Sequence, residues 1–286
     1  MADVVVAPGL LEACWHNFVL GVVQGLTEFL PISSTAHLKV VPVLVGWGDP
    51  GVSVTAVIQL GSIAAVLAYF RSDLAKVLRG IANACRRGQW REPEARLGFA
   101  MALGTLPILM AGLLIKVFWP GYATSPLRSV PSIAVVSIVM ALLLAFAEKL
   151  GPRMKQLPQV QGRDGLVVGL AQALAIIPGV SRSGSTLTAS LLDGWQRADA
   201  ARFSFLLGIP AITIAGLVEL KDALADPNTG GILPLLVGIA TAAVVSWLAI
   251  DWLIRYLQRH STWIFVGYRL LFGVLLLAWW TTTASN

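Results

Sequence analysis

Charged side chains are scarce in this sequence. Of its 286 residues only 13% are charged, whereas 56% are hydrophobic. A typical soluble domain carries about 25% charged residues, so this composition excludes an ordinary soluble globular protein. We therefore expect a polytopic membrane protein of the all-α class, with the bilayer as the solvent of most side chains.

Cysteines and acidic residues are also few. Cys14 and Cys85 lie far apart in the chain, a spacing that excludes a disulfide framework and a zinc site. Acidic residues are outnumbered, which leaves a net charge of +6, but in a membrane protein basic residues mark cytoplasmic loops. We expect no nucleic-acid partner. Residues 1–15 lack a positively charged n-region, so no cleavable signal peptide is expected either.

Long hydrophobic runs dominate what is present. Six are long enough to cross a hydrocarbon core of about 30 Å as helices. They cover residues 52–70, 97–118, 132–147, 203–220, 232–254 and 263–280. Two further apolar regions, residues 18–47 and 166–195, are each interrupted by Pro, Gly and Ser. Each is predicted to form a helix, a turn and a second helix.

The basic residues predict the orientation of these runs. Residues 71–96 contain seven Lys or Arg and residues 149–163 contain four, so both segments are expected in the cytoplasm. This assignment is consistent only if region 166–195 enters from the cytoplasm and returns to it, as a re-entrant hairpin. Region 18–47 then enters from the outside, and both termini lie on the outer face.

The single membrane domain, residues 1–286, thus divides into two halves of opposite orientation. They cover residues 14–147 and 164–280, and each contains a re-entrant hairpin followed by three spans. In such inverted repeats the broken helices commonly meet near the bilayer midplane and form a binding site there. We expect the two hairpins to meet in this way.

The first hairpin contains QGLTEFLPISSTAH. Gln24 and Glu28 lie four residues apart and share one helix face, a spacing that suits a divalent cation or its diphosphate complex. Hydroxyl side chains occupy the turn that follows: Ser33, Ser34 and Thr35. Ser34 and His37 have the chemistry of a nucleophile and a general base. A purely structural role is the alternative, but ionisable groups at membrane depth cost about 2.5 to 3.5 kcal/mol on insertion scales, which favours function.

The second hairpin contains PGVSRSGST. Arg182 carries a permanently charged guanidinium, whose planar set of donors suits phosphate oxygens. Backbone amides between Pro178 and Gly184 can converge on an anion. Helix capping would explain the hydroxyls of Ser183 and Thr186 equally well. Arg269, in the last span, is expected to extend to the cytoplasmic surface, where its charge meets water.

Together the two motifs predict a phosphate site inside a membrane. A soluble phosphate ester has no need of that location, whereas an amphiphile with a phosphorylated head and a long lipid tail does. The motifs also resemble the two signature regions of the bacterial undecaprenyl-diphosphate phosphatase family, known for bacitracin resistance, and the resemblance extends over nearly the whole chain.

This resemblance implies a hydrolase of the bacterial plasma membrane. Its substrate would be undecaprenyl diphosphate, and loss of the terminal phosphate would regenerate the lipid carrier for cell-wall synthesis. The resemblance also implies a site that opens to the outer face and depends on a divalent cation, Mg²⁺ or Ca²⁺. A lipid-phosphate transporter or flippase with inverted repeats is the alternative, and the hydroxyl–histidine pair favours the enzyme.

The resemblance assigns roles to individual residues. Its catalytic group corresponds to Glu28, Ser34, His37 and Arg182. Its supporting positions correspond to Gln24, Ser33, Ser181, Ser183 and Thr186, and we expect Thr35 and Gly184, in the two turns, to contact the substrate with them. Gln24 and Glu28 are the expected metal ligands, although an amide is a poorer ligand than the carboxylate that some family members have there. Either Ser34 or a water molecule could be the nucleophile.

Overall fold

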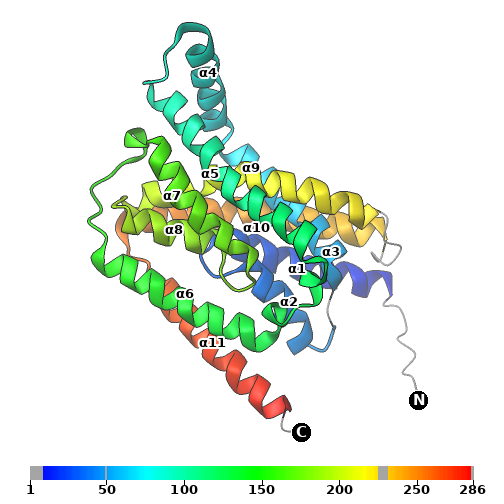
Figure 1. Ribbon diagram of the computed structural model, residues 1–286. Coiled ribbons are helices and arrows are strands. Elements are labelled where there is room, and N and C mark those ends of the chain that lie inside the picture. The colour runs from blue at the N-terminus through cyan, green and yellow to red at the C-terminus, as the bar shows by residue number, and fades with distance from the viewer. Residues whose placement is uncertain (1–8, 49, 225–230, 285–286) are drawn as a thin grey trace, which may run out of the picture.

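The computed structural model describes residues 9–48, 50–224 and 231–284. These residues form helices joined by turns (Figure 1) and contain no strand beyond one isolated bridge, between Lys155 and Trp195. The α-helices are α1 (Leu10–Phe29), α2 (Ser34–Leu44), α3 (Gly51–Tyr69), α4 (Arg71–Arg87), α5 (Pro93–Phe118), α6 (Val130–Leu150), α7 (Gly162–Ala173), α8 (Arg182–Leu192), α9 (Arg197–Leu224), α10 (Ile232–Arg259) and α11 (Trp263–Ala284). Short 3-10 helices are η1 (Pro120–Thr124), η2 (Pro126–Arg128), η3 (Leu157–Gln159) and η4 (Leu174–Ile176).

The hydrophobic runs coincide with long helices. Helices α5, α6, α9, α10 and α11 are long and apolar enough to span a bilayer, and α3 with α4 forms a sixth candidate bent by 68°. Large apolar side chains on these helices face outward: Leu113, Val244 and Leu271 are each at least 60% exposed. Such surfaces are stable in lipid and unfavourable in water. The predicted all-α, multi-pass membrane class is confirmed.

One helix was not predicted. Residues 71–87, expected to belong to a basic loop, form α4 at the top of Figure 1. The segment is amphipathic, so it buries Val77 and Ala84 while most of its basic side chains remain exposed. It packs on the start of α5, where a Cβ on Gly80 would lie 2.6 Å from the Cβ of Glu94. Gly88, with φ of 72°, ends the helix in the left-handed conformation.

Both interrupted regions form the predicted helix, turn and second helix. The first consists of α1 and α2, and the second of α7 with η4, followed by α8. Each second helix has a serine N-cap at positive φ: Ser33 has φ of 79° and Ser181 has φ of 69°. Among the described residues other than glycine, only Arg153 shares a positive φ. Such strained backbone is concentrated at functional sites in proteins, and here it recurs at matching positions of the two hairpins.

The helices pack in matching pairs. Helix α1 lies against α10 and α7 lies against α5, while α3 packs on α9 and α6 on α11. The first two pairs approach closely through glycine: a Cβ on Gly25 would lie 2.6 Å from the Cβ of Val245, and one on Gly169 would lie 2.3 Å from the carbonyl oxygen of Gly104. Small residues at such contacts let helix backbones pack tightly within a membrane. These contacts fix the first helix of each interrupted region in the bundle.

Candidate active site

The turns of the two interrupted regions meet at a cavity of about 150 Å³. Several predicted site residues line it: Glu28, Ser33, Ser34, Thr35, Ser181 and Arg182. The remaining lining comes from α3, α5, α9 and the segment that follows α7. Residues about 150 positions apart in the sequence therefore share one polar site, as the hairpin hypothesis requires.

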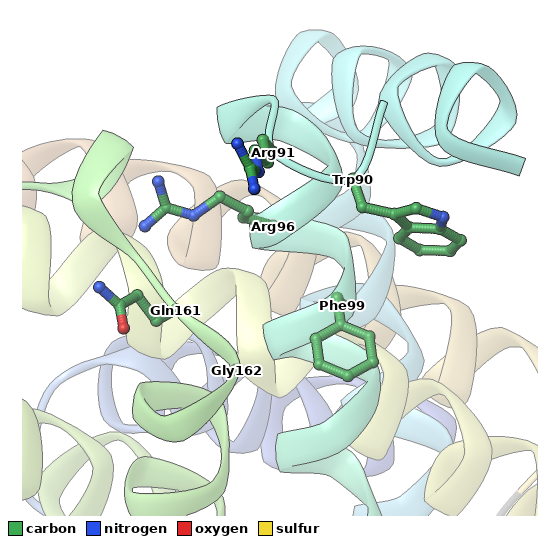
Figure 2. Close-up of a pocket in the computed structure, with 6 residues that line it drawn as sticks. All are labelled: Trp90, Arg91, Arg96, Phe99, Gln161 and Gly162. Atoms are coloured by element: carbon green, nitrogen blue, oxygen red, sulfur yellow. The ribbon is translucent and has the colours of Figure 1, made fainter. Parts of the chain in front are cut away.

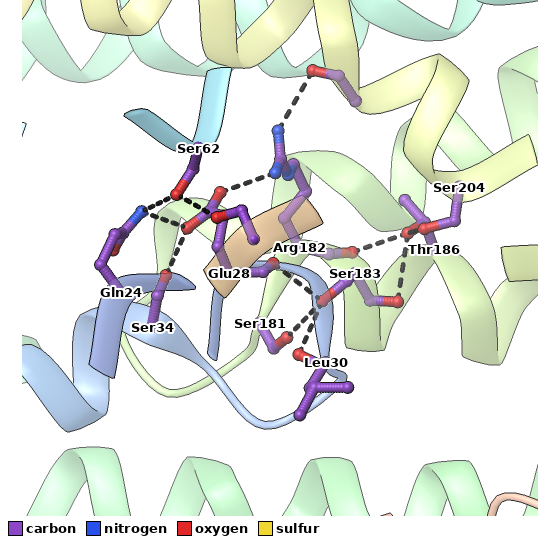
Figure 3. A network of polar contacts seen from close by, with 12 residues as sticks. Gln24, Glu28, Leu30, Ser34, Ser62, Ser181, Arg182, Ser183, Thr186 and Ser204 are labelled. Atoms are coloured by element: carbon purple, nitrogen blue, oxygen red, sulfur yellow. Dashed lines mark hydrogen bonds and ion pairs between the residues drawn. The ribbon is translucent and has the colours of Figure 1, made fainter. Parts of the chain in front are cut away.

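Glu28 is the centre of the polar network in Figure 3. Its Oε1 accepts a hydrogen bond from Nη2 of Arg182 at 2.7 Å. Its Oε2 accepts a hydrogen bond from Oγ of Ser34 at 2.7 Å and another from Nε2 of Gln24 at 3.2 Å. The hydroxyl proton of Ser34 thus already points at a carboxylate oxygen, which is the arrangement that a proton acceptor for a serine nucleophile needs.

Arg182 compensates the charge of this carboxylate. The side chains of Arg182 and Glu28 are only 14% and 9% exposed, so each charge depends on the other for stabilisation inside the bundle. Nη1 of Arg182 also donates to the carbonyl oxygen of Gly208 on α9, at 3.1 Å. A Cβ at Gly208 would lie 3.1 Å from the same Nη1, so glycine leaves the space in which the guanidinium lies.

Helices α2 and α8 both begin at the cavity, at Ser34 and Arg182. The first amides of a helix have no acceptor within that helix and carry its positive dipole end, so they attract anions. Ser183 ties the two turns together, because its Oγ donates to the carbonyl oxygen of Leu30 at 3.0 Å. The cavity therefore combines one guanidinium, two helix N-termini, hydroxyl groups and one carboxylate.

Five predicted residues do not line the cavity but contact other protein groups: Gln24 and Ser183, whose contacts are given above, and His37, Thr186 and Gly184. His37 is 4% exposed; its Nδ1 contacts the carbonyl oxygen of Ser33 at 2.7 Å and its Nε2 contacts the hydroxyl of Tyr268 at 2.6 Å. Thr186 donates to the carbonyl oxygen of Arg182 at 2.7 Å and contacts Ser204. Gly184 donates its amide to Oγ of Ser181 at 3.1 Å.

The contacts of His37 bear on the expected proton transfer. Its ring lies against Phe272, with ring centroids 4.3 Å apart, because the bond from Nδ1 back to Ser33 turns the imidazole toward α11. Both ring nitrogens are occupied, and the hydroxyl of Ser34 contacts Glu28 instead. Glu28, rather than His37, is therefore the residue in contact with the Ser34 hydroxyl in this structure.

The residues fit a cation that arrives with a diphosphate better than a resident one. No group of three or more His, Cys, Asp or Glu suited to a metal occurs in the described part of the chain. Mg²⁺ commonly binds through one or two carboxylates together with substrate phosphates, and Glu28 supplies one carboxylate. Gln24 donates from its amide nitrogen to Glu28 and, at 3.3 Å, to Ser62, so it supports the carboxylate.

Sequence reasoning missed several contributors to the site. Ser62 supports Gln24 and in turn accepts a hydrogen bond from Ser246 at 2.8 Å. Polar residues within the apolar runs were a usable signal for both serines. Gly208 contributes through its carbonyl oxygen, for which the sequence carries no signal. Arg269 was expected at the surface but is 1% exposed, and an arginine within a span was itself the signal.

A larger cavity, of about 720 Å³, lies apart from this network (Figure 2). It is lined by Trp90, Arg91, Arg96, Phe99, Gln161 and Gly162. These residues include neither a carboxylate nor a hydroxyl group. Size alone therefore does not identify the candidate site, because the carboxylate and the hydroxyl groups line the smaller cavity.

The helices and the buried polar site define a class: a multi-pass membrane protein that keeps an ion pair and a serine inside an apolar bundle. The family described as bacitracin resistance protein BacA matches residues 17–275. The chain belongs to this family. It is 79% identical over 286 residues to the undecaprenyl-diphosphatase of Synechococcus sp. strain WH7803, covering 100% of both chains. It is 78% identical over 277 residues to the protein of that name from Prochlorococcus marinus strain MIT 9303, covering 97% of this chain and 94% of the other.

Proposed function

We propose that this protein hydrolyses the terminal phosphate of undecaprenyl diphosphate, giving undecaprenyl phosphate and inorganic phosphate. The name shared by its relatives supports this activity. The observation that carries the proposal is the contact from Ser34 to Glu28, with Arg182 paired to the same carboxylate in one cavity. In this proposal Ser34, or a water molecule beside it, is the nucleophile, Glu28 is its base, and Arg182 binds the phosphate within an apolar bundle that a lipid substrate can reach.

In the proposed reaction Arg182 and the first amides of α8 bind the phosphate oxygens. Oxygen attacks the terminal phosphorus, either from Ser34 or from a water molecule at the same place, while Glu28 takes the proton. The new O–P bond replaces the bond to the bridging oxygen, which leaves with undecaprenyl phosphate. If Ser34 attacks, water then hydrolyses the phosphoserine and restores the enzyme.

A divalent cation, Mg²⁺ or Ca²⁺, would be held by Glu28 together with the diphosphate. Its chemistry there is neutralisation of phosphate charge. The charge balance of the site supports this requirement. The pair of Glu28 and Arg182 is neutral by itself, so a diphosphate that engages Arg182 adds uncompensated negative charge beside the carboxylate. A cation on that carboxylate offsets it.

The proposed topology has six transmembrane helices and two re-entrant hairpins in an inverted repeat. It is supported by the matching helix pairs, by the serine N-caps at positive φ, and by the lengths of α7 and α8, which have 12 and 11 residues. At about 1.5 Å per residue they cover about 16 to 18 Å, too short to cross about 30 Å of hydrocarbon. Helix α1 has 20 residues, covers about 30 Å and begins earlier than expected, at Leu10, so for the first hairpin the proposal rests on the matching helix pairs, the serine N-cap and the 11-residue α2.

The proposed orientation places the basic segments in the cytoplasm of a bacterial plasma membrane. Helix α4 would then lie on the cytoplasmic side, and the hairpin of α1 and α2 would open outward. The expected outer position of the termini concerns residues 1–8 and 285–286, which lie outside the described residues. With this orientation the phosphate is released on the outer face and the lipid carrier is recycled for cell-wall synthesis.

Phosphate release from a polyprenyl diphosphate by the purified protein tests the function. We expect release that stops with chelator and returns with Mg²⁺ or Ca²⁺, because hard cations prefer oxygen ligands. A lipid-phosphate transporter would share the inverted repeat, but it would not need a serine hydroxyl held on a carboxylate. Transport of lipid phosphate without any hydrolysis would support that alternative and overturn the proposed enzyme.

A further inference from the structure

Arg269 is a buried cation that the reaction described above leaves unused. It lies on α11, in a candidate membrane span, and is 1% exposed. Among its described contacts there is no carboxylate: its guanidinium donates only to backbone carbonyl oxygens. An unpaired charge at this depth is costly, so its retention calls for a specific role.

The acceptors of Arg269 belong to both turns of the site. Nη1 donates to Pro31 in the first turn and to Val180 in the second, each at 3.1 Å. Nη2 donates to Gly179 at 2.5 Å, and Nε donates to Ser137 of α6 at 3.3 Å. One rigid guanidinium thus joins the turn that precedes Ser34 to the turn that precedes Arg182.

Two glycines of the second motif make room for this contact. A Cβ at Gly184 would lie 2.9 Å from Nη1 of Arg269 and 3.1 Å from Cβ and Oγ of Ser181, so a larger residue there would press on the guanidinium and on the N-cap of α8 together. Gly179 has φ of 95°, a conformation that other residues rarely adopt, and it brings its carbonyl oxygen to Nη2. Gly179 and Gly184 therefore allow the contacts of Arg269, in addition to the anion binding expected of their turn.

The hydrogen bond from Arg269 to the carbonyl oxygen of Val180 also sets the direction of the Ser181 amide. In a trans peptide the N–H and C=O groups point in opposite directions, and the described residues contain no cis peptide. Because the carbonyl of Val180 faces Arg269, the amide of Ser181 faces the other way. Ser181 and Gly179 line the cavity and Arg269 does not, so Arg269 lies behind the turn.

We propose that Arg269 is a positioning residue for the reaction. It holds the two turns in register, so that the serine of one lies opposite the phosphate clamp of the other, and it turns the Ser181 amide toward the phosphate. This role rests on the proposed function. Arg269 itself touches neither phosphate nor nucleophile, and its effect on the reaction passes through the carbonyls of Pro31, Gly179 and Val180.

The test compares Arg269→Lys with wild type. Lysine keeps the charge but cannot reach carbonyls on both turns at once. Because misplacement of reacting groups by about 1 Å can cost about 100-fold in rate, we expect kcat to fall by about 10- to 100-fold. The KM for the polyprenyl diphosphate should change by less than about threefold, since the lipid tail still supplies most of the binding. Gly184→Ala should show the same pattern while leaving Arg269 in the chain, so it serves if Arg269→Lys fails to fold.

Arg197→Lys is the matched control. Arg197 forms an ion pair with Glu148 away from the cavity, so its loss lowers the Tm without moving the turns. If Arg269→Lys and Gly184→Ala keep kcat within about threefold of wild type, or if Arg197→Lys loses as much kcat at an equal Tm, the positioning role is wrong.

A second measurement separates this inference from the proposed function. Inorganic pyrophosphate with Mg²⁺ should raise the Tm of wild type and raise that of Arg269→Lys less. A wild-type protein that binds pyrophosphate but releases no phosphate from lipid substrate would refute the function alone. An equal Tm rise in both proteins would refute the orientation of the Ser181 amide by Arg269.

Discussion

Replacement of Arg182 by lysine tests the phosphate clamp most directly. The guanidinium reaches Oε1 of Glu28 at 2.7 Å and the carbonyl oxygen of Gly208 at 3.1 Å. A lysine ammonium keeps the charge but is a single point, so it can satisfy one of these acceptors and loses the two-pronged contact with phosphate. Arg182→Ala removes the charge as well and leaves Glu28 buried without its partner.

The contacts set the expected size of each effect. One lost hydrogen bond to a charged group is worth about 1.5 to 3 kcal/mol, and each 1.36 kcal/mol is a factor of ten in rate. Arg182→Lys should therefore lower kcat/KM by about 10- to 150-fold with little loss of stability. Arg182→Ala should destabilise the fold by about 3 to 5 kcal/mol, which is the cost of removing one partner of a buried ion pair. It should also lower kcat/KM further than Arg182→Lys does.

Phosphate release in detergent micelles and thermal unfolding of the same preparations measure both effects. Arg202→Lys is the control, because Arg202 lies on the same helix as Gly208 but pairs with Asp73, at 2.5 Å, outside the cavity. It should keep normal turnover. If Arg182→Ala turns over substrate within about threefold of wild type, the clamp assignment is refuted, and with it the explanation for Gly208.

The remaining predictions concern the carboxylate, the imidazole and the orientation. Glu28→Gln should lower kcat by about 100- to 10,000-fold, as loss of a general base does. Gln24→Glu should retain turnover and reach half-maximal rate at a lower Mg²⁺ concentration, because it adds a second carboxylate; equal losses from both changes would contradict Glu28 as the principal acidic group of the site. From its contacts away from Ser34, His37→Ala should cost less than about tenfold in kcat, and a loss of 100-fold or more would support the acid–base role predicted from the sequence. In intact spheroplasts an impermeant thiol reagent should label a cysteine introduced at Gly48 and leave native Cys85 unlabelled, although Cys85 is exposed; labelling of Cys85 would reverse the proposed orientation.

Much of the fold could be predicted because the length of an apolar run is visible in the local sequence. Each predicted run of apolar residues became one long helix, and proline and glycine interrupted the two regions at the expected places. The amphipathic helix α4 escaped prediction because its apolar residues, such as Val77, are few, and the basic residues between them were interpreted as a loop. Its burial depends on α5, which no local pattern reveals.

The sequence by itself determined the solvent, the helices and the chemistry of both motifs, since composition, run length and residue type need no partner to be recognised. Only the tertiary structure decided which atoms meet. It brought Ser34 to Glu28 and turned His37 toward Tyr268, although Ser34 is six residues from Glu28 and only three from His37, so spacing in the chain did not show which of the two it would contact. It also placed Arg269 behind both turns instead of at the surface. A hydrogen bond depends on a donor–acceptor distance held within a few tenths of an ångström and on a favourable angle. Both are fixed by the packing of helices far apart in the chain.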